Sequence, residues 1–295
     1  MPELPEIETV RLQLAKVLPG KKIRKIEILK LKSFQGKKEL AEGKEVIGVK
    51  RMAKVLLIDL AGDIDIAIHF KMTGQLVFEP AVQKSTKYEV PSAKGRIVGG
   101  HPTKDFTGEL PSKHTRVIFR LDSGTLYFND QRLFGWVMVN SEFKIQNLKF
   151  LQNLGPEPFD ITGEEFEKLV SRSKRPIKLV LMDQTVISGV GNIYANDALW
   201  EAKVNPRRLA NTLRGNQYKE LYKSVLGVLR EGIRYGGATA ADAKYINLHG
   251  LGGHYQEHFR TYDREGEECL REDGGIIHKF ILGGRGTYFC PVCQR

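Results

Sequence analysis

The three cysteines of the chain cluster near its C-terminus, at Cys269, Cys290 and Cys293. The C-P-V-C spacing of the last two lets both thiolates reach one tetrahedral metal ion. Because three cysteines cannot all pair as disulfides within one chain, their clustering favours metal binding. We therefore expect one structural Zn²⁺ ion. The alternative is a finger that has lost its metal and is held by packing.

The fourth ligand of such a site is open from the sequence. The residues after Cys269 read LREDGG, where a second cysteine would complete a strong zinc pattern. Carboxylate oxygen and imidazole nitrogen are both acceptable to zinc. The candidates near this position are Glu272, Asp273 and His278.

The N-terminal residues MPELPEIETV carry an unusual density of proline and acid. Pro5 suits the first turn of a helix, and acids in that turn are stabilised by the positive helix end. A helix start accounts for Glu6 and Glu8. It does not account for Pro2 or Glu3, which precede the helix.

The segment SGVGN (188–192) joins two expected helices, and Asn192 begins the second of them. Free backbone amides at a helix start form an anion site, to which Asn192 adds a side-chain donor. A packing turn is the alternative. The segment LGGRGTYF before Cys290 predicts a hairpin tip that presents Arg285, which by itself is also compatible with an ordinary surface residue.

Apolar and basic side chains occur together at several strand ends. Met72 lies in KMTGQL, while Arg132 and Phe134 are two apart in DQRLFG and therefore share one face. Singly, Met and Phe are most often core residues. Together with Arg they suit insertion of apolar side chains into a base stack, with Arg facing the base that has lost its pairing partner. Lys54 and His69 lie in or beside strand patterns, where a buried lysine requires an anionic partner.

The elements that position these residues change character along the chain. Residues 5–18 predict an amphipathic helix, and the following hundred residues predict short strands of a β-sandwich or barrel. The polar stretch 81–113 predicts a long surface loop. After about residue 145 the pattern is helical, with helices expected over 161–173, 176–187, 192–204 and 217–236. Residues 236–256 are glycine-rich, and strand-like segments return near the cysteines.

Bulk properties narrow the function classes. A length of 295 residues fits two domains, and a net charge of +11 with a pI of about 9.4 favours a polyanionic partner, although a basic solvated surface explains the charge equally well. No run of about 18 apolar residues spans a bilayer, and no secretory signal pattern is present. We expect a cytoplasmic protein without a membrane partner.

The motifs taken together resemble the formamidopyrimidine-DNA glycosylase family. The resemblance covers the whole chain through MPELPEIETV, MAKVLL, HFKMTGQL, DQRLFG, LGPEP, ISGVGNIYANDALW, REGEEC and GGRGTYFCPVCQ. It implies an α+β fold: an N-terminal helix and β-sandwich (1–145), a linker (146–160), a helix–two-turn–helix domain (161–255) and a zinc-finger hairpin (256–295). Damaged double-stranded DNA would bind a monomer.

The resemblance assigns the opening residues to catalysis. After removal of Met1, Pro2 would be a free secondary amine, part of which is unprotonated at neutral pH. It would attack the sugar C1′, expel the damaged base and lead to strand cleavage by β- and δ-elimination. Glu3 would act as the acid/base. If Met1 stays attached, Pro2 is an amide and this mechanism fails.

The resemblance also assigns DNA contacts. Lys54 matches a lysine that contacts the phosphate beside the lesion, and His69, Asn192 and Arg285 match phosphate-binding residues. Lys54 and Arg285 are counted with Pro2 and Glu3 in the catalytic set. Met72, Arg132 and Phe134 match a set that fills the void left by the extruded nucleotide. Residues 236–250 would cover the flipped base, but GGATAADAKYINLHG departs from the usual pattern, as do the incomplete cysteine set and the 81–113 stretch.

The leading hypothesis is a bifunctional DNA glycosylase/AP lyase that acts on 8-oxoguanine and formamidopyrimidines in bacterial base excision repair. An endonuclease VIII-like preference for oxidised pyrimidines is the alternative within the family. A non-catalytic damage-binding protein and a simple zinc-ribbon nucleic-acid binder are alternatives of other classes. The intact Pro2, Glu3 and Lys54 argue against the non-catalytic reading.

Overall fold

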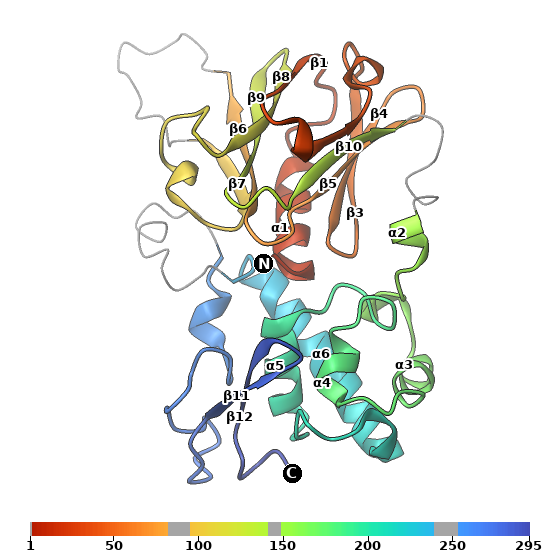
Figure 1. Ribbon diagram of the computed structural model, residues 1–295, viewed down its shortest axis with the longest axis vertical. Helices are drawn as coiled ribbons and strands as arrows, with labels where there is room; N and C mark the ends of the chain where they lie inside the picture. Colours follow the sequence, from red (N-terminus) through yellow and green to blue (C-terminus); the bar gives the residue numbers. More distant parts are fainter. Residues whose placement is uncertain (1, 82–94, 141–148, 239–252) are drawn as a thin grey trace. The chain divides into compact units, whose positions relative to one another are not determined.

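The computed structural model describes residues 2–81, 95–140, 149–238 and 253–295 (Figure 1). The chain divides into two compact units. The first comprises Met1–Gln152 with Gly236–His254, and the second comprises Asn153–Tyr235 with Tyr255–Arg295. Each unit therefore contains two separate stretches of the chain.

The first unit is a β-sandwich with one long helix, α1 (Leu4–Leu14). One sheet has the strand order β1-β8-β9-β6-β7 and the other has the order β2-β10-β5-β4-β3. The strands are β1 (Ile23–Ile28), β2 (Phe34–Gly36), β3 (Val46–Met52), β4 (Val55–Leu60), β5 (Ile64–His69), β6 (Gly74–Pro80), β7 (Ile97–Gly100), β8 (Thr115–Leu121), β9 (Gly124–Asp130) and β10 (Trp136–Asn140). Short helical segments η1 (Leu31–Ser33), η2 (Lys38–Leu40) and η3 (Lys104–Phe106) and the helix α2 (Lys149–Gln152) complete it.

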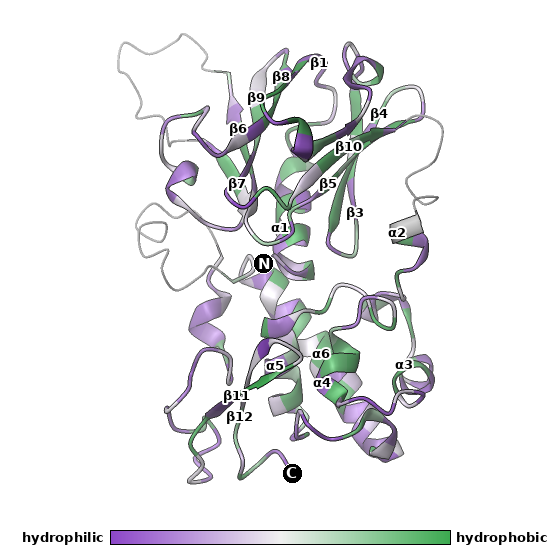
Figure 2. Cartoon of the chain, in the orientation of Figure 1, coloured by the Kyte–Doolittle hydropathy of each residue, from purple (hydrophilic) through white to green (hydrophobic). Residues whose placement is uncertain are grey.

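The core of this unit lies between the sheets and α1. Hydrophobic residues follow the strands of both sheets (Figure 2). Ile7, Val10 and Leu14 of α1 are buried in the same cluster as Ile66, Ile68 and other strand residues, which confirms the helical spacing predicted for the N-terminus. The helix ends at Leu14, four residues before the predicted end, and the turn that follows buries Leu18.

The stretch 81–113 is not only a loop, so the prediction was wrong for the strand at residues 97–100 and for the short helical turn at residues 104–106. Residues 97–100 form β7, which pairs with β6, and α1 lies directly against it. A Cβ on Gly99 would lie 1.9 Å from Cγ2 of Val10, so only glycine permits this approach. The strand was missed because IVGG is short and half glycine, a composition that disfavours strands. Residues 82–94 of the predicted loop lie outside the described residues.

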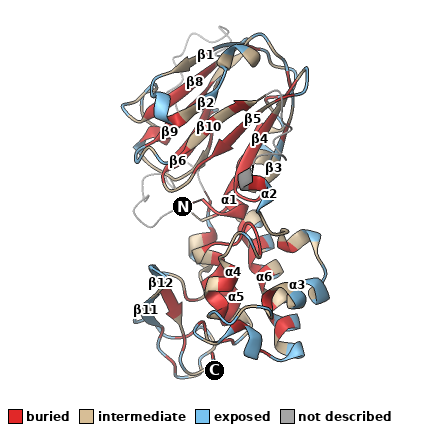
Figure 3. Cartoon of the chain, turned by 45° about the vertical axis from the view of Figure 1, so that its right-hand side comes forward, coloured by how far each residue is buried: buried red, intermediate tan, exposed pale blue. Residues whose placement is uncertain are grey.

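The second unit is mainly helical. It contains η5 (Pro158–Asp160), α3 (Gly163–Val170), α4 (Ile177–Leu181), α5 (Asn192–Glu201), η6 (Ala210–Thr212), α6 (Gly215–Arg234) and η7 (Tyr255–His258), followed by the hairpin β11 (His278–Leu282) and β12 (Arg285–Phe289). Helices α4 and α5 are almost entirely buried and form its centre (Figure 3). Thr162 caps α3 as predicted, with Glu165 completing the capping box.

One predicted helix is much shorter in the structure. The pattern predicted a helix over 176–187, but α4 ends at Leu181. Gln184 folds the next residues into a turn, because its side-chain amide donates to the carbonyls of Met182 and Val190 while its oxygen accepts from Gly189. Polar side chains that bond the local backbone compete with helix in this way.

The architecture is therefore α+β: a helix on a β-sandwich, a helical region and a C-terminal hairpin beside a cysteine cluster. This confirms the predicted fold class. Among the helices in the described ranges, none is both long and apolar enough to cross a bilayer.

Candidate active site and metal centre

Pro2 and Glu3 lie buried immediately before α1. Glu3 is the N-cap residue, with extended backbone angles of φ −106° and ψ −169°. Its backbone N–H donates to Oε2 of Glu6 at 2.7 Å, and its side chain accepts from the backbone of Glu6. This reciprocal capping box fixes the direction in which the chain enters the helix. Only 2% of Glu3 is exposed, so its carboxyl group lies in a largely desolvated site.

Glu6 joins this N-terminal segment to a distant part of the chain. Its Oε1 accepts from the backbone N–H of Ala238 at 2.8 Å, while Oε2 accepts from Glu3. A Cβ on Gly237 would lie 2.8 Å from Cγ of Glu6, and the φ of Gly237 is +83°. Gly253 packs against Gly237 so closely that its Cβ would lie 1.9 Å from the Gly237 carbonyl oxygen. Gly237 and Ala238 therefore lie against α1, and Gly253 packs on Gly237; residues 239–252 lie outside the described residues.

Lys54 lies in the tight turn between β3 and β4. Met52 pairs with Val55, which leaves Ala53 and Lys54 as the two turn residues, and Ala53 has φ of +50°. Arg51 fixes this hairpin to α1, because its Nε donates to Oε2 of Glu8 at 2.9 Å and its NH1 donates to the carbonyl of Ala53. The Arg51–Glu8 ion pair therefore joins the hairpin to α1. Lys54, beside this pair, is 6% exposed.

His69 ends β5 beside Lys54, opposite Val55 in the sheet register. Burial, with smaller contributions from the charges of Lys71 and Lys54, lowers the pKa of His69 to about 3. Its Nδ1 accepts from the backbone N–H of Lys71 at 3.0 Å, so the neutral ring carries its proton on Nε2. His69 can therefore donate a hydrogen bond to an anion without carrying a charge itself.

Arg132 and Phe134 lie together on one turn, and Met72 directly precedes Thr73, whose hydroxyl accepts from the N–H of Arg132 in that turn. Gly74 of β6 pairs with Asp130 of β9, which places the residue before Gly74 beside the turn after Asp130. The guanidinium carbon of Arg132 lies 5.0 Å from the centre of the Phe134 ring, and both side chains are exposed. Half of the Phe134 surface is exposed, so this apolar ring is accessible to a partner.

Asp130 builds the turn that carries Arg132 and Phe134. It is fully buried; its Oδ1 accepts from Oγ1 of Thr73 and from the N–H of Arg132 at 3.2 Å, and its Oδ2 accepts from the N–H of Gly135 at 2.7 Å. One carboxylate thus fixes both ends of the turn and links it to β6. Sequence reasoning missed this role, although the acid that opens DQRLFG at the end of an apolar strand was the available signal.

Asn192 and Arg285 belong to the second unit, and Asn192 binds the backbone of the residue that follows Arg285. Nδ2 of Asn192 donates to the carbonyl of Gly286 at 3.1 Å, one residue after Arg285. Arg285 opens β12 opposite Leu282, and the turn residues Gly283 and Gly284 have φ of +57° and +73°. The predicted hairpin tip is confirmed, and Arg285 is exposed on it.

Lys178 fixes the hairpin against the helices and was not found from the sequence. It is fully buried in α4, and its Nζ donates to the carbonyl of Gly286 and to Oγ1 of Thr287, each at 2.8 Å. A buried ammonium needs such partners. Lysine in the otherwise apolar run PIKLVL was the only sequence signal.

The three cysteines form a cluster with Asp273, and their ligand atoms all lie within 4.8 Å of one another. The Sγ atoms of Cys269 and Cys293 are 3.9 Å apart, and Sγ of Cys290 lies 3.6 Å from both carboxylate oxygens of Asp273. A tetrahedral zinc ion with Zn–S bonds of about 2.3 Å separates its sulfur ligands by about 3.8 Å. The spacing therefore fits zinc, and of the three predicted alternatives Asp273 is the residue within the described cluster.

The surroundings of the cluster also fit a metal. Nε1 of Trp200 donates to Sγ of Cys269 at 3.4 Å, and NH1 of Arg271 donates to Sγ of Cys293 at 3.5 Å. Such donors stabilise thiolate ligands. Burial raises the pKa of the Cys293 thiol to about 12, and a bound cation would be needed to hold it as a thiolate. A Cβ on Gly275 would lie 2.4 Å from Sγ of Cys290, so the ligand loop requires glycine there.

Glu272 and His278, the other two predicted alternatives, are exposed and lie outside the cluster. His278 is in β11, opposite Phe289. Glu272 has φ of +54°, in the turn that directs the next side chain toward the sulfurs.

Comparisons with known proteins identify the family of the chain. The formamidopyrimidine-DNA glycosylase N-terminal domain matches residues 1–137, and the formamidopyrimidine-DNA glycosylase H2TH domain matches residues 154–244. A formamidopyrimidine-DNA glycosylase of Pelotomaculum thermopropionicum is 40% identical, with 100% of this chain and 99% of the relative covered.

Solved structures are similar over the full length. The Lactococcus lactis Fpg in complex with DNA that contains an abasic site has a TM-score of 0.81 and 29% identity, with 100% of both chains covered. A MutM complex with carbocyclic 8-oxo-G containing DNA has a TM-score of 0.80 and 29% identity, again with 100% of both chains covered. On the fold, the matched domains and the full-length relative, the chain belongs to the formamidopyrimidine-DNA glycosylase family of DNA repair glycosylases.

Proposed function

We propose that the protein is a bifunctional DNA glycosylase and AP lyase that removes oxidised purines, chiefly 8-oxoguanine and formamidopyrimidines, during base excision repair. The observation that carries the proposal is the Pro2–Glu3 pair, buried and fixed by the capping box at the start of α1. The related complexes with abasic-site DNA and with 8-oxo-G DNA support the substrate class.

Pro2 is the proposed nucleophile once Met1 has been removed. Its nitrogen lone pair attacks the sugar C1′, and the electron pair of the glycosidic bond leaves with the damaged base, which takes up a proton. The nitrogen of this C1′ adduct loses its proton, and its lone pair then expels the ring oxygen O4′, which takes up a proton from Glu3. The result is an iminium between Pro2 and the opened sugar. The iminium acidifies the C2′ proton, so loss of that proton expels the 3′ phosphate, and a second elimination expels the 5′ phosphate.

Glu3 is the proposed acid/base for these proton transfers. Its carboxyl group is buried, which keeps water away, and Glu3 directly follows the nucleophile Pro2 in the chain. Glu6 does not share this role in our proposal, because both of its oxygens accept backbone hydrogen bonds. Its function is to hold the segment that carries Pro2.

Lys54, His69, Asn192 and Arg285 are the proposed phosphate contacts, with Lys54 and Arg285 beside the reacting nucleotide. Met72, Arg132 and Phe134 are the proposed filling set. The exposed Phe134 and Arg132, held in contact on a turn fixed by Asp130, support insertion into a base stack. Unstacking costs a few kcal/mol, which these contacts offset.

The Cys269, Asp273, Cys290 and Cys293 cluster is the proposed site of one structural zinc ion. When bound, the ion would supply a rigid tetrahedral crosslink that orders the residues preceding and following the β11–β12 hairpin. We further propose that the protein is a monomer in the bacterial cytoplasm, with domain boundaries near residues 145, 160 and 255.

Strand cleavage of defined duplexes tests the proposed activity. The protein should cut a duplex with 8-oxoguanine opposite cytosine and leave phosphate at both ends of the gap, while Pro2→Gly and Glu3→Gln bind that duplex but cut it at least 100-fold more slowly. A duplex with thymine glycol should be cut more slowly by the unaltered protein. Faster cutting of the thymine glycol duplex would favour the endonuclease VIII-like alternative, and binding without cutting of either duplex would favour the damage-binding one.

A further inference from the structure

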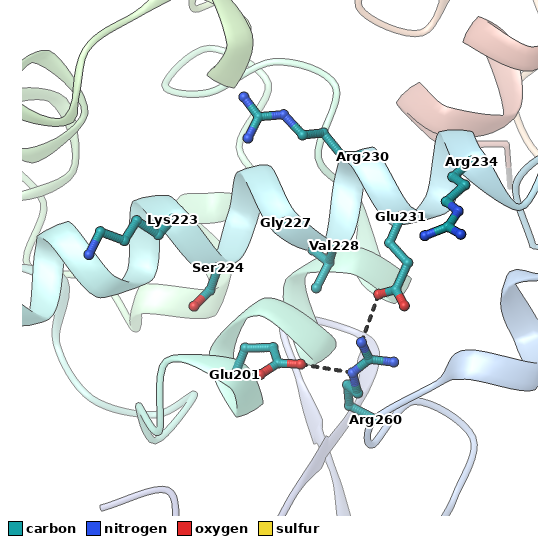
Figure 4. Close-up of a pocket in the computed structure, with 9 residues that line it drawn as sticks. All are labelled: Glu201, Lys223, Ser224, Gly227, Val228, Arg230, Glu231, Arg234 and Arg260. Carbon is teal, nitrogen blue, oxygen red and sulfur yellow. Dashed lines mark hydrogen bonds and ion pairs between the residues drawn. The ribbon is translucent and has the colours of Figure 1, made fainter.

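A groove on the second unit runs along the exposed face of α6 and does not include Asn192 or Arg285. It has a volume of about 530 Å³ and is lined by Glu201, Lys223, Ser224, Gly227, Val228, Arg230, Glu231, Arg234 and Arg260 (Figure 4). Volumes of this size are typical of binding sites for small ligands and short segments. We name it the α6 groove.

The α6 groove presents cations whose charge is not neutralised locally. Lys223, Arg230 and Arg234 are exposed and, being 7 and 4 residues apart, lie on one face of the helix. Arg230 and Arg234 have no carboxylate partner among the residues that the structure describes; they lie only over the rings of Phe159 and Tyr235, at 5.8 Å and 5.7 Å. Within the described residues Lys223 pairs only with Glu220, and this ion pair is exposed and therefore weak.

The two carboxylates of the groove are already engaged. Arg260 donates to Glu201 at 2.8 Å and to Glu231 at 2.7 Å, as the dashed lines in Figure 4 show. These contacts fix Arg260 in the wall of the groove. The remaining surplus is positive, so the groove selects for an anionic ligand.

Gly227 lines the α6 groove, and no packing contact explains a glycine at this position. A Cβ at Gly227 would have no heavy atom within 4 Å, whereas a Cβ at Gly232 of the same helix would lie 2.5 Å from the ring of Tyr194. Glycine is among the least favourable residues in a helix interior. Packing thus requires glycine at position 232 but not at position 227. Because Gly227 has no side chain, the space between Lys223 and Arg230 stays unfilled.

We propose that the α6 groove binds an acidic segment of a partner protein in extended conformation. From Lys223 to Arg234 the helix rises about 16 Å, which an extended peptide spans with about five residues. A run of five or six acidic residues can therefore present carboxylates to all three cations, and Arg forms bidentate pairs with carboxylates. A concave groove with the apolar Val228 in its lining suits a peptide better than the convex backbone of a duplex.

The groove is separate from the proposed DNA contacts of the same unit. It includes Glu201 at the C-terminal end of α5, whereas Asn192 begins that helix. The two ends of a helix of this length are about 14 Å apart. The proposal therefore predicts that peptide binding and DNA cleavage change independently.

Fluorescence anisotropy with a labelled decapeptide that carries six consecutive aspartates tests the proposal, at 150 mM salt and with the full-length protein. Arg230→Gln/Arg234→Gln should weaken binding at least tenfold. Arg172→Gln/Lys174→Gln removes the same charge from exposed positions of the same unit and should leave binding unchanged. Cleavage of the 8-oxoguanine duplex should be unchanged in both variants.

Gly227→Glu provides a second variant whose folding is not in doubt, because the position is open and glutamate favours helix. Its carboxylate should occupy the groove and abolish peptide binding. No peptide binding by the unaltered protein, or equal weakening in the groove and control pairs, would overturn the proposal. So would binding of a labelled hexathymidylate that depends on Arg230 and Arg234 and displaces the peptide, because the groove would then be a nucleic-acid site.

Discussion

At the scale of single residues, the site depends on buried groups whose partners are backbone amides. Glu6 accepts from Glu3 and Ala238, and Asp130 accepts from Arg132 and Gly135. Hydrogen bonds to ionised groups are stronger than neutral ones, and they hold a fixed direction. The residues proposed to react with DNA are therefore positioned by neighbouring carboxylates that do not themselves react.

Glu6→Gln should weaken both the fold of the first unit and the reaction. The amide can accept only one of the two backbone hydrogen bonds, and its NH₂ then faces the other N–H donor. Loss of such a buried contact costs about 1–3 kcal/mol. Thermal unfolding should show this loss, and the rate of 8-oxoguanine excision should fall although the proposed chemical groups, Pro2 and Glu3, are retained. Unchanged unfolding and excision would contradict the positioning role.

His69 gives the stability a dependence on pH. Its pKa is about 3 in the folded chain, chiefly because of burial, compared with about 6.5 for an unfolded histidine. Below pH 6.5 the unfolded chain takes up a proton that the folded chain refuses, so stability is full above that pH and is lost as the pH falls toward 3. The slope attributable to His69 approaches about 1.4 kcal/mol per pH unit.

Urea unfolding between pH 7 and pH 5 measures this slope. In His69→Gln the slope should be smaller, because glutamine does not titrate. If stability depended on pH equally in the variant and in the unaltered protein, His69 would take up its proton as readily in the folded chain as in the unfolded chain, which would contradict the prediction.

At the scale of elements, short turns at the ends of strands carry the proposed DNA-filling residues. The pairing of Gly74 with Asp130 brings two separate stretches of sequence into contact, and the Asp130 carboxylate then shapes the turn. The same principle holds in the second unit, where Lys178 of α4 and Asn192 of α5 both bind the Gly286 carbonyl of the hairpin.

Asp130→Asn should loosen the turn without changing Arg132 or Phe134. An amide nitrogen would face the N–H of Gly135 or the donors Thr73 and Arg132, at a cost of about 1–3 kcal/mol. We expect weaker binding to a duplex with an abasic-site analogue. Asp63→Asn is the control, because Asp63 is exposed at φ +55°, which asparagine tolerates. Equal duplex binding by both variants and the unaltered protein would refute the role of Asp130.

Elements with strong periodicity could be predicted from the sequence, whereas elements that depend on tertiary contacts could not. The apolar spacing of Ile7, Val10 and Leu14 predicted α1, and the alternation in DIDIAIHF predicted β5. The strand β7 was missed because its glycines are explained only by its contact with α1. Likewise, Gln184 ends α4 through side-chain bonds that no periodicity reveals.

The candidate site followed the same division. The motif residues were found in the sequence, but their supports Asp130, Lys178 and Arg51 were not, since their partners lie far away in the chain. The fourth metal ligand was open between three residues, because only the folded loop decides which of them faces the sulfurs.

At the scale of the whole molecule, two units carry complementary parts of the proposed function. The first holds Pro2, Glu3, Lys54, His69 and the filling set, and the second holds Asn192, Arg285 and the metal cluster. The hairpin that presents Arg285 ends directly before Cys290. Ordering of the metal cluster should therefore affect DNA binding through this hairpin.

Replacement of Asp273 tests this link. Asp273→Ala should lose zinc during dialysis against EDTA under conditions in which the unaltered protein retains it, and Asp273→Cys should retain it more firmly, because thiolate binds zinc well. Glu272→Ala is the matched control and should retain zinc as the unaltered protein does. Metal content is measured by mass spectrometry, with duplex affinity as the second reading. Retention of zinc by Asp273→Ala would exclude Asp273 as a ligand.

The central claim is that the N-terminal amine of Pro2 forms a covalent bond with the damaged nucleotide. Borohydride reduction during reaction with a duplex that carries 8-oxoguanine opposite cytosine, followed by mass spectrometry of the trapped peptide, tests it most directly. We predict an adduct on a peptide that begins at Pro2. The Pro2→Gly variant should give a much lower yield of adduct. An adduct on a lysine, or cleavage without any adduct, would contradict the claim.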